Sequence, residues 1–282
     1  IGGAGYVGSD LVPFLLQKGF KITVYDLMIY GENVLEKHKD LKIIKGDIRN
    51  EILLTKIIPG HDIVIHLACI SNDPSFELNP KLGKSINLDS FEPIVKLSKS
   101  LGIERFIYAS SSSVYGVKEE EHVSENMILE PLTDYSKFKA KCEKILLKYK
   151  STNFVPVILR PATVCGYASR QRLDVVVNIL TNIAFHKKQI NVFGGDQLRP
   201  NLHIRDMSRA YLAIINADKS LVEGKIFNVG YENLKVREIA EKVSMVFGKK
   251  IKINELESND KRSYHISSKK ILNELNFKPN HT

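Results

Sequence analysis

Short apolar runs of strand length alternate along the chain with longer segments whose apolar residues recur at helical spacing. The run at 62–68 is apolar enough to be buried on both faces of a parallel sheet. Strands are predicted at 21–26, 41–46, 62–68, 105–109 and 153–160. Because helical segments separate successive strands, the order predicts an α/β fold with a doubly wound parallel sheet.

The elements become shorter after Gly166. Before it, long helices are predicted at 80–101, bent near Pro93, and at 135–149, with Thr133 or Asp134 as the N-cap. After it, the pattern predicts helices near 174–186, 206–217, 235–247 and 268–275, and extended pieces at 190–193, 202–204 and 225–229. We expect a dinucleotide-binding domain at 1–165 and a smaller α+β lobe at 166–282, with parts of 197–230 returning to the first sheet.

Gly2, Gly5 and Gly8 form a G-x-x-G-x-x-G motif at the start of a predicted helix. This spacing allows a tight turn, a backbone that a pyrophosphate can approach, and close packing of helix on sheet. Asp26 ends the next strand eighteen residues after Gly8, where an acid can accept hydrogen bonds from an adenosine ribose. No Lys or Arg follows it to hold a 2′-phosphate, so the motif predicts NAD rather than NADP. A parallel strand should precede such a turn, and we expect the native chain to begin several residues before Ile1.

Four consecutive serines, Ser110 to Ser113, follow the strand at 105–109 and could not all be core residues. The helix at 135–149 carries Tyr135 in its first turn and Lys139 one turn further on the same face. The hypothesis is that Ser111, Tyr135 and Lys139 form an oxidoreductase site. A phenol has a pKa of about 10, and we expect Lys139 and an oxidised nicotinamide to lower the pKa of Tyr135 by roughly 3 units.

The Tyr-x-x-x-Lys spacing is weak by itself, since Tyr231 and Lys235 also have it. No serine-bearing strand precedes Tyr231, which makes that pair an internal control.

Composition narrows the class of protein. The 282 residues carry a formal net charge of +9, with Lys and Arg scattered among 32 acidic residues. This is typical of a solvated surface or of a protein whose partner carries phosphates, and no aromatic and basic stripe indicates nucleic acid.

Three cysteines without C-x-x-C spacing predict structural thiols and no metal site. No apolar run reaches the ~18 residues of a membrane span, so we expect a cytoplasmic protein with no membrane contact.

Together these motifs resemble the extended short-chain dehydrogenase/reductase family, namely its NAD-dependent epimerase/dehydratases acting on nucleotide-sugars, such as the UDP-glucose 4-epimerases. The resemblance covers nearly the whole chain. It is carried by the glycine motif, Asp26, Gly46 to Ile48, His66 to Ala68, Asn87, Ser110, Ser111, Tyr115, Gly116, Tyr135, Lys139, Arg160, Pro161, residues 194–196, Arg199 and residues 203–206. It implies NAD as the cofactor and a nucleotide-diphosphate sugar as the substrate.

The resemblance also implies roles for single residues. It selects Ser111 among the serines, makes Tyr135 the group that takes the sugar-hydroxyl proton while hydride passes to NAD, and places Lys139 on the nicotinamide ribose. Asp47 can reach the adenine amino group, with Ile48 against the ring. The predicted cofactor contacts are Gly2, Gly5, Tyr6, Val7, Gly8, Asp26, Asp47, Ile48, Leu67, Ala68, Asn87, Tyr135 and Lys139.

Departures from the family pattern bear on the reaction. The 4,6-dehydratases of the family carry an Asp-Glu pair where this chain has Ser112 and Ser113, and the GDP-fucose-forming enzymes carry a Cys at the position of Ser113. The resemblance therefore implies a 4-epimerase that oxidises C4 transiently. The alternatives are a C4 dehydrogenase or 4-ketoreductase, less favourably a 4,6-dehydratase, and a non-catalytic dinucleotide-binding regulator.

On the substrate side, Arg199 and Arg262 match family arginines expected to bind the nucleotide diphosphate. Thr163 stands where many epimerases have Asn. The predicted substrate contacts are Ser111, Ser112, Ser113, Thr163, Asn178, Arg199 and Arg262. A homodimer, formed through helices near 87–101 and 135–149, is a further implication of the resemblance.

Overall fold

A four-stranded parallel sheet forms the centre of the protein. The structure is a computed structural model, and it describes residues 1–71, 73–120, 122–248, 251–258, 263 and 265–281. The central sheet has the order β3-β4-β5-β9. Its strands are β3 (Ile63–His66), β4 (Arg105–Ala109), β5 (Val155–Pro161) and β9 (Ile226–Val229), all parallel.

A parallel pair, β1 (Ile22–Asp26) and β2 (Leu41–Lys45), continues this layer. The amino group of Ile1 donates to the Ile65 carbonyl in β3 at 2.9 Å, and the Gly2 N–H donates to the Tyr25 carbonyl in β1 at 2.8 Å. The start of the chain thereby connects β1 with β3. All five strands predicted at 21–26, 41–46, 62–68, 105–109 and 153–160 are present, with ends shifted by at most two residues.

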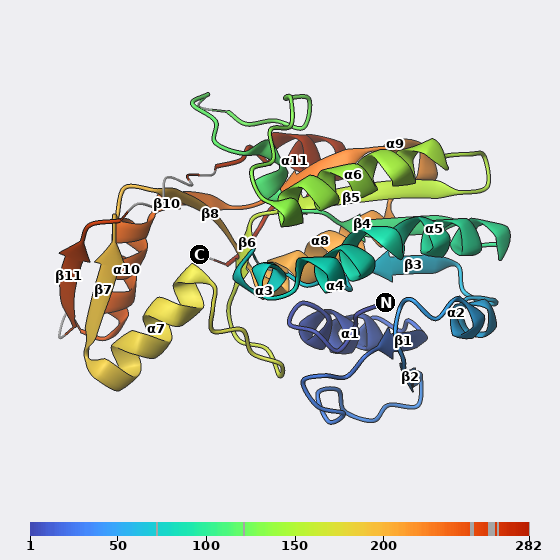
Figure 1. Ribbon diagram of the computed structural model, residues 1–282, viewed down its shortest axis with the longest axis horizontal. Coiled ribbons are helices and arrows are strands. Elements are labelled where there is room, and N and C mark those ends of the chain that lie inside the picture. Colours follow the sequence, from blue (N-terminus) through green and yellow to red (C-terminus); the bar gives the residue numbers. More distant parts are fainter. Residues whose placement is uncertain (72, 121, 249–250, 259–262, 264, 282) are drawn as a thin grey trace.

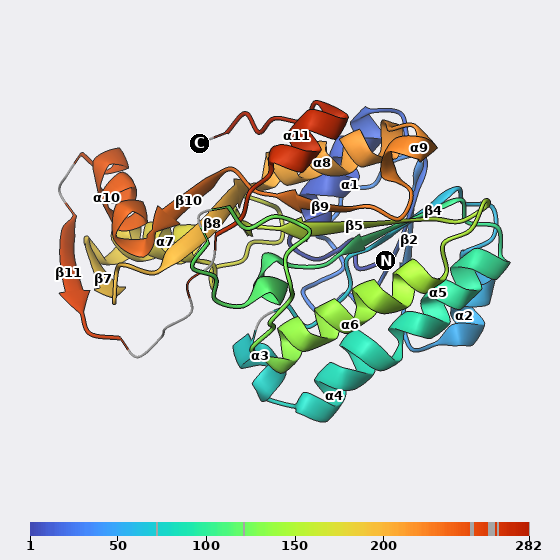
Figure 2. The ribbon, with the colours of Figure 1, turned by 90° about the horizontal axis from the view of Figure 1, so that it is seen from above.

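Helices cover both faces of the sheet, which confirms the α/β fold (Figures 1 and 2). One face carries α2 (Glu51–Ile57), α4 (Pro80–Lys84), α5 (Phe91–Ser100) and α6 (Asp134–Lys148). The other carries α1 (Gly8–Gln17), α8 (Ile204–Asn216), α9 (Lys219–Val222) and α11 (Lys269–Leu275). Alternate residues of β5 serve the two cores: Val157 and Leu159 pack with α1 and α8, and Ile158 packs with α5 and α6. Burial on both faces explains why the strands read as unbroken apolar runs.

The predicted helix at 80–101 is wrong as one element. A short helix α3 (Asp73–Glu77) precedes α4, and a π-helical turn at Ser85–Asp89 separates α4 from α5. Pro93 lies in the first turn of α5, where its missing N–H costs no helical hydrogen bond. In the π turn, the Asn87 side chain accepts from the Ile70 N–H at 2.8 Å and donates to its carbonyl at 2.9 Å, which fixes the loop after β3.

The second lobe is smaller. In it β7 (Gln189–Phe193) pairs with β11 (Lys252–Leu256), and α7 (Val176–Lys187) and α10 (Val236–Val246) pack against them. A second small sheet places β8 (Leu198–His203) between β6 (Thr163–Cys165) and β10 (Glu232–Lys235). β6, β10 and β11 were not predicted, because three to five residues give too little apolar alternation to recognise.

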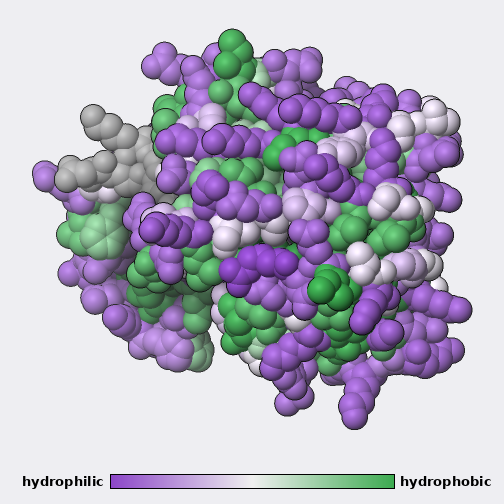
Figure 3. Space-filling model, turned by 45° about the vertical axis from the view of Figure 1, so that its right-hand side comes forward, coloured by the Kyte–Doolittle hydropathy of each residue, from purple (hydrophilic) through white to green (hydrophobic). Residues whose placement is uncertain are grey.

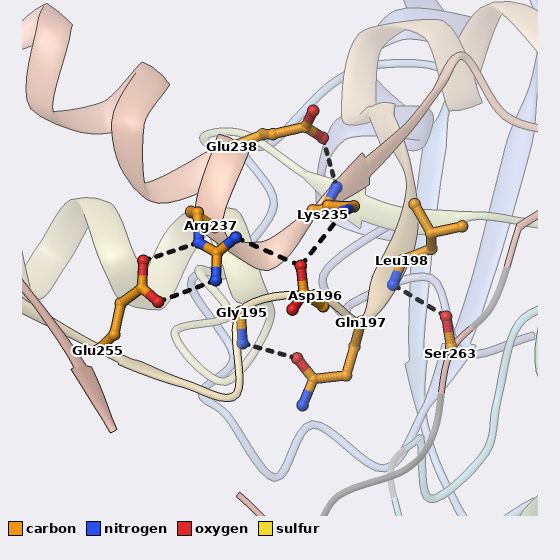
Figure 4. A network of polar contacts seen from close by, with 9 residues as sticks. All are labelled: Gly195, Asp196, Gln197, Leu198, Lys235, Arg237, Glu238, Glu255 and Ser263. Carbon is orange, nitrogen blue, oxygen red and sulfur yellow. Dashed lines mark hydrogen bonds and ion pairs between the residues drawn. The ribbon is translucent and has the colours of Figure 1, made fainter. Parts of the chain in front are cut away.

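Ion pairs fix the turn that leads into β8 (Figure 4). Arg237 donates to the Glu255 carboxylate in β11 at 2.7 and 2.9 Å, and it also reaches Asp196 in the turn at 3.3 Å. Lys235 binds the same Asp196 at 3.2 Å. The turn is thus held to both α10 and β11, and β8 begins from a fixed point.

Hydrophilic side chains cover most of the face shown in Figure 3, and hydrophobic ones gather between them in separate groups. This distribution agrees with charges that are scattered along the sequence. The described part of the chain contains no helix that is long and apolar enough to cross a membrane. The three cysteines are free thiols.

Candidate active site

A cavity of about 720 Å³ opens where the carboxyl ends of β4 and β5 meet the glycine loop and the second lobe. Loops at this edge of a parallel sheet are the usual place for a ligand. The predicted residues that line it are Gly2, Gly5, Tyr6, Val7, Gly8, Leu67, Ser111, Ser112, Ser113, Tyr135, Lys139, Thr163 and Arg199. The structure therefore brings together residues predicted for the cofactor, for catalysis and for the substrate.

The glycine loop fits a dinucleotide diphosphate. Gly2 has φ +81°, and a Cβ there would lie 2.4 Å from the Ala68 nitrogen. At Gly8 a Cβ would lie 2.3 Å from the Gly3 carbonyl oxygen, so the helix packs on the loop without space for a side chain. At Gly5 the nearest atom would be the Gly2 carbonyl oxygen at 3.5 Å. The outer two glycines are needed for packing, and the middle one leaves backbone open toward the cavity.

Asp26, Asp47, Ile48, Ala68 and Asn87 lie outside the cavity lining. The Asp26 carboxylate accepts from the Ala4 N–H at 2.9 Å and the Met28 N–H at 2.8 Å, so it holds the glycine loop in place. Asp47 accepts from the backbone and guanidinium of Arg49, whose hydrogen bonds lower the pKa of the Asp47 carboxyl. Ile48 is buried. Contacts of these residues with ribose and adenine stay predictions.

The three predicted catalytic residues meet at the carboxyl end of β4. Ser111 caps a short 3₁₀ turn, where its hydroxyl lies 2.9 Å from that of Ser113 and accepts from the Ser113 N–H at 3.1 Å. Thr133 caps α6, as one of the two predicted candidates, and this sets the first turn that carries Tyr135. Lys139 donates to the Ala109 carbonyl at 2.7 Å, and its Nζ lies 5.7 Å from the centre of the Tyr135 ring.

Burial raises the pKa of Tyr135, while the positive charges of Lys139 and Arg172 and the interaction with the Ser111 side chain oppose the rise. Lys139 therefore lowers the pKa of Tyr135, as predicted. In the protein alone, however, the desolvation of the phenolate raises that pKa by more than Lys139 lowers it. The cations that this chain supplies do not by themselves bring the phenol pKa below its ordinary value.

A buried polar cluster supports this region from beneath. Arg160 of β5 and Glu143 of α6 form a bidentate ion pair, Nε to Oε1 at 3.0 Å and Nη2 to Oε2 at 2.6 Å, with both side chains 3% exposed. Ser110 donates to Glu143, Arg160 donates to the Tyr115 hydroxyl at 2.8 Å, and that hydroxyl donates to Asn228 of β9 at 2.7 Å. The cluster joins the serine loop to α6, β5 and β9.

Two arginines of the loop after β6 are functional candidates that sequence analysis missed. Arg172 lines the cavity, binds Asp174 at 2.7 and 2.9 Å, and is close enough to Tyr135 to act on the phenol pKa. Arg170 also lines the cavity, with its guanidinium carbon 3.6 Å from the centre of the Tyr30 ring. The loop has no apolar periodicity, so nothing in the sequence placed it over the site.

Of the remaining predicted substrate residues, some line the cavity and others do not. Thr163 and Arg199 line the cavity. Asn178 does not, because its amide accepts from the Gly166 N–H at 2.9 Å and donates to the Arg172 carbonyl at 2.8 Å and the Tyr6 hydroxyl at 3.1 Å. It thus holds the arginine loop in position. Arg262 lies outside the described residues.

Comparison with known proteins decides the family. The profile of the NAD dependent epimerase/dehydratase family matches residues 1–230. The chain belongs to this family. The family is NAD-dependent, in agreement with the glycine loop.

The relatives of this chain carry more than one activity in their names. The uncharacterized UDP-glucose epimerase YtcB of Bacillus subtilis is 31% identical over 264 residues, covering 88% of this chain and 81% of that protein. The dTDP-glucose 4,6-dehydratase of Streptomyces niveus is 25% identical over 302 residues, covering 99% and 86%. The solved structure of UDP-glucuronic acid 4-epimerase from Bacillus cereus with UDP-glucuronic acid and NAD has a TM-score of 0.89 and 27% identity, covering 100% of this chain and 93% of the other.

The glycine loop provides a first test. In Gly8→Ala the new methyl group meets the Gly3 carbonyl, and we expect a loss of about 1–3 kcal/mol in the free energy of unfolding, measured by urea denaturation. Gly5→Ala is the matched variant, because there the methyl group has space. It should unfold like the wild type but bind NAD more weakly in calorimetry. Equal destabilisation by the two substitutions would contradict this division of roles.

The buried ion pair provides a second test. Glu143→Gln leaves the Arg160 guanidinium buried without its carboxylate, and we expect it to lower the free energy of unfolding by about 3–5 kcal/mol. Glu32→Gln is the control, because the exposed pair of Glu32 with Lys45 is screened by solvent, and its unfolding midpoint should match the wild type. A wild-type midpoint for Glu143→Gln would show that the pair does not hold the serine loop.

Proposed function

We propose that the protein is a nucleotide-sugar 4-epimerase that oxidises the sugar at C4 and reduces it again on the opposite face. The proposal is supported by the way Ser111, Tyr135 and Lys139 converge on a cavity with a dinucleotide-type glycine loop. NAD, when bound, supplies the hydride acceptor and one further positive charge. The names of relatives do not choose between epimerase and dehydratase, so the choice depends on the side chains around the reacting sugar.

The choice of an epimerase over a dehydratase rests on which carboxylates line the cavity. Among the described residues lining it, Asp174 is the one carboxylate, and it is paired with Arg172. Ser112 and Ser113 occupy the positions after Ser111. Elimination of water from a keto-sugar needs a positioned acid and base, and two hydroxyls of ordinary acidity are poor substitutes. Oxidation and reduction at C4 need only the proton transfer that Tyr135 can make.

Each residue then has a defined task. Tyr135 takes the proton from the C4 hydroxyl and later returns it, and Ser111 donates a hydrogen bond to the same oxygen. Lys139, fixed on the Ala109 carbonyl, holds its charge beside the phenol. Arg199, which lies in β8 and lines the cavity, binds the diphosphate in this proposal. Because hydride returns from one side only, the keto-sugar must turn within the cavity, whose volume of about 720 Å³ gives it room.

A C4 dehydrogenase or 4-ketoreductase is the second candidate, because it uses the same three residues without returning the hydride to the sugar.

We propose a homodimer through the 87–101 and 135–149 regions as the assembly. Light scattering of the purified protein tests this assembly separately from the reaction.

Product analysis distinguishes the candidates. The full-length protein is incubated with UDP-, GDP-, CDP- and dTDP-sugars, and products and NADH absorbance are followed together. We expect inversion at C4 with no net NADH. Accumulating NADH would identify the dehydrogenase, and a 4-keto-6-deoxy product would overturn the argument from Ser112 and Ser113.

Tyrosine substitution tests the assigned base. Tyr135→Phe removes the group that takes the proton, and we expect turnover to fall about 10²- to 10⁴-fold while NAD remains bound. Tyr231→Phe is the matched control, because Tyr231 has the same spacing to Lys235 but does not line the cavity. Full activity of Tyr135→Phe would reject its role, and a wild type inactive on every sugar but binding NAD would favour a non-catalytic regulator.

A further inference from the structure

Arg170 is a positive charge at the cavity whose partner is still to be found. It lies in the loop between β6 and α7, and it lines the cavity. In the described part of the chain its guanidinium makes one hydrogen bond, from Nη1 to the Gln171 carbonyl at 3.1 Å, and has no carboxylate partner. Arg172, in contrast, is paired with Asp174 at 2.7 Å. Since a guanidinium has five N–H donors, the charge of Arg170 and most of its donors are available to an anion.

The ring of Tyr30 fixes the orientation of this guanidinium. Tyr30 follows β1, and the guanidinium carbon of Arg170 lies 3.6 Å from the centre of its ring. Both residues line the cavity, and neither is buried. A stacked guanidinium uses its face for the ring and keeps its edge, which carries the N–H groups, for hydrogen bonds. Arg170 is therefore held in a defined position and stays accessible to a ligand.

The loop that carries Arg170 is attached to the glycine loop and to the start of α1 (Figure 1). The Arg170 N–H donates to the Ser9 hydroxyl at 3.2 Å. The Tyr6 hydroxyl donates to the Gly166 carbonyl at 2.7 Å and accepts from the Asn178 amide at 3.1 Å. Both ends of the segment 166–178 are thus held at the glycine loop, and Arg170 lies between them, against the first turn of α1.

The glycine loop itself brings no basic side chain to a diphosphate. No Lys or Arg occurs from Ile1 to Gln17. The start of a helix supplies only about half a positive charge through its N–H groups, whereas each phosphate of a dinucleotide is negatively charged. Arg170 reaches this region from the second lobe and Tyr30 from the loop after β1, and together they place a cation beside the glycine loop.

We propose that Arg170 binds the diphosphate of NAD. Arginine binds phosphate through parallel charge-assisted hydrogen bonds, which suit an edge left free by stacking. The second lobe then contributes directly to cofactor binding, and the cofactor strengthens the attachment of that lobe to the first. This inference goes beyond the proposed reaction and does not depend on it, because it needs only the NAD that the family uses.

Calorimetry on the full-length protein, stripped of bound cofactor, tests the proposal without any turnover. Arg170→Gln removes the charge and keeps a polar side chain. We expect its affinities for NAD and ADP-ribose to fall by a similar factor, about 10- to 100-fold, the size of a charge-assisted hydrogen bond. Its affinity for adenosine, which has no phosphate, should equal that of the wild type. Arg170→Lys keeps the charge and should recover part of the lost affinity.

Arg237→Gln is the matched control, because Arg237 is an arginine of the same lobe that is paired with Glu255 and Asp196 and does not line the cavity. It should bind NAD like the wild type, which excludes a general effect of net charge. Three outcomes would overturn the proposal: wild-type affinity of Arg170→Gln for NAD, an equal loss for NAD and adenosine, or a larger loss for UDP than for NAD. The second would indicate a displaced loop, and the third would assign Arg170 to the diphosphate of the substrate.

Discussion

The arrangement of the site depends on the ion pair between Glu143 and Arg160. Moving two charges out of water is costly, and such a pair is stable only where its remaining hydrogen bonds are satisfied. Ser110, Tyr115 and the two partners themselves supply these bonds. Shifting any of the elements that carry them would leave a buried charge incompletely paired. The serine loop, α6 and β5 are therefore held in one register with little freedom to adjust.

This constraint extends to the proposed catalytic groups, because they lie close to the ion pair along the chain. Ser110 precedes Ser111, and Glu143 lies one helical turn after Lys139, which is itself one turn after Tyr135. Fixing Ser110 to Glu143 consequently fixes the serine hydroxyl relative to the phenol and the ammonium group. The bond from Lys139 to the Ala109 carbonyl connects the same helix to the end of β4. The protein alone thus holds Ser111, Tyr135 and Lys139, the proposed catalytic residues, in one arrangement.

The sequence predicts those parts of the molecule in which one short segment determines its own structure. The strands are apolar enough to be recognised alone, and Gly2 and Gly8 mark a loop whose packing admits no side chain. It does not predict features that arise from distant segments. The π turn at Ser85–Asp89 has no local signal, and the loop of Arg170 and Arg172 is aperiodic. The roles of Arg170 and Arg172 become visible only when the fold places them at the cavity.

The state of Tyr135 follows from two opposing effects. Burial favours the neutral phenol, whereas Lys139 and Arg172 favour the phenolate. Because Lys139 is itself buried and bonded to a carbonyl, water does not screen its charge from the phenol, yet burial still prevails. A third positive charge in the cavity shifts this balance toward phenolate. Under the proposed function, Tyr135 is therefore a weak base when no oxidised cofactor is bound, and a stronger one when the cofactor is in place to accept hydride.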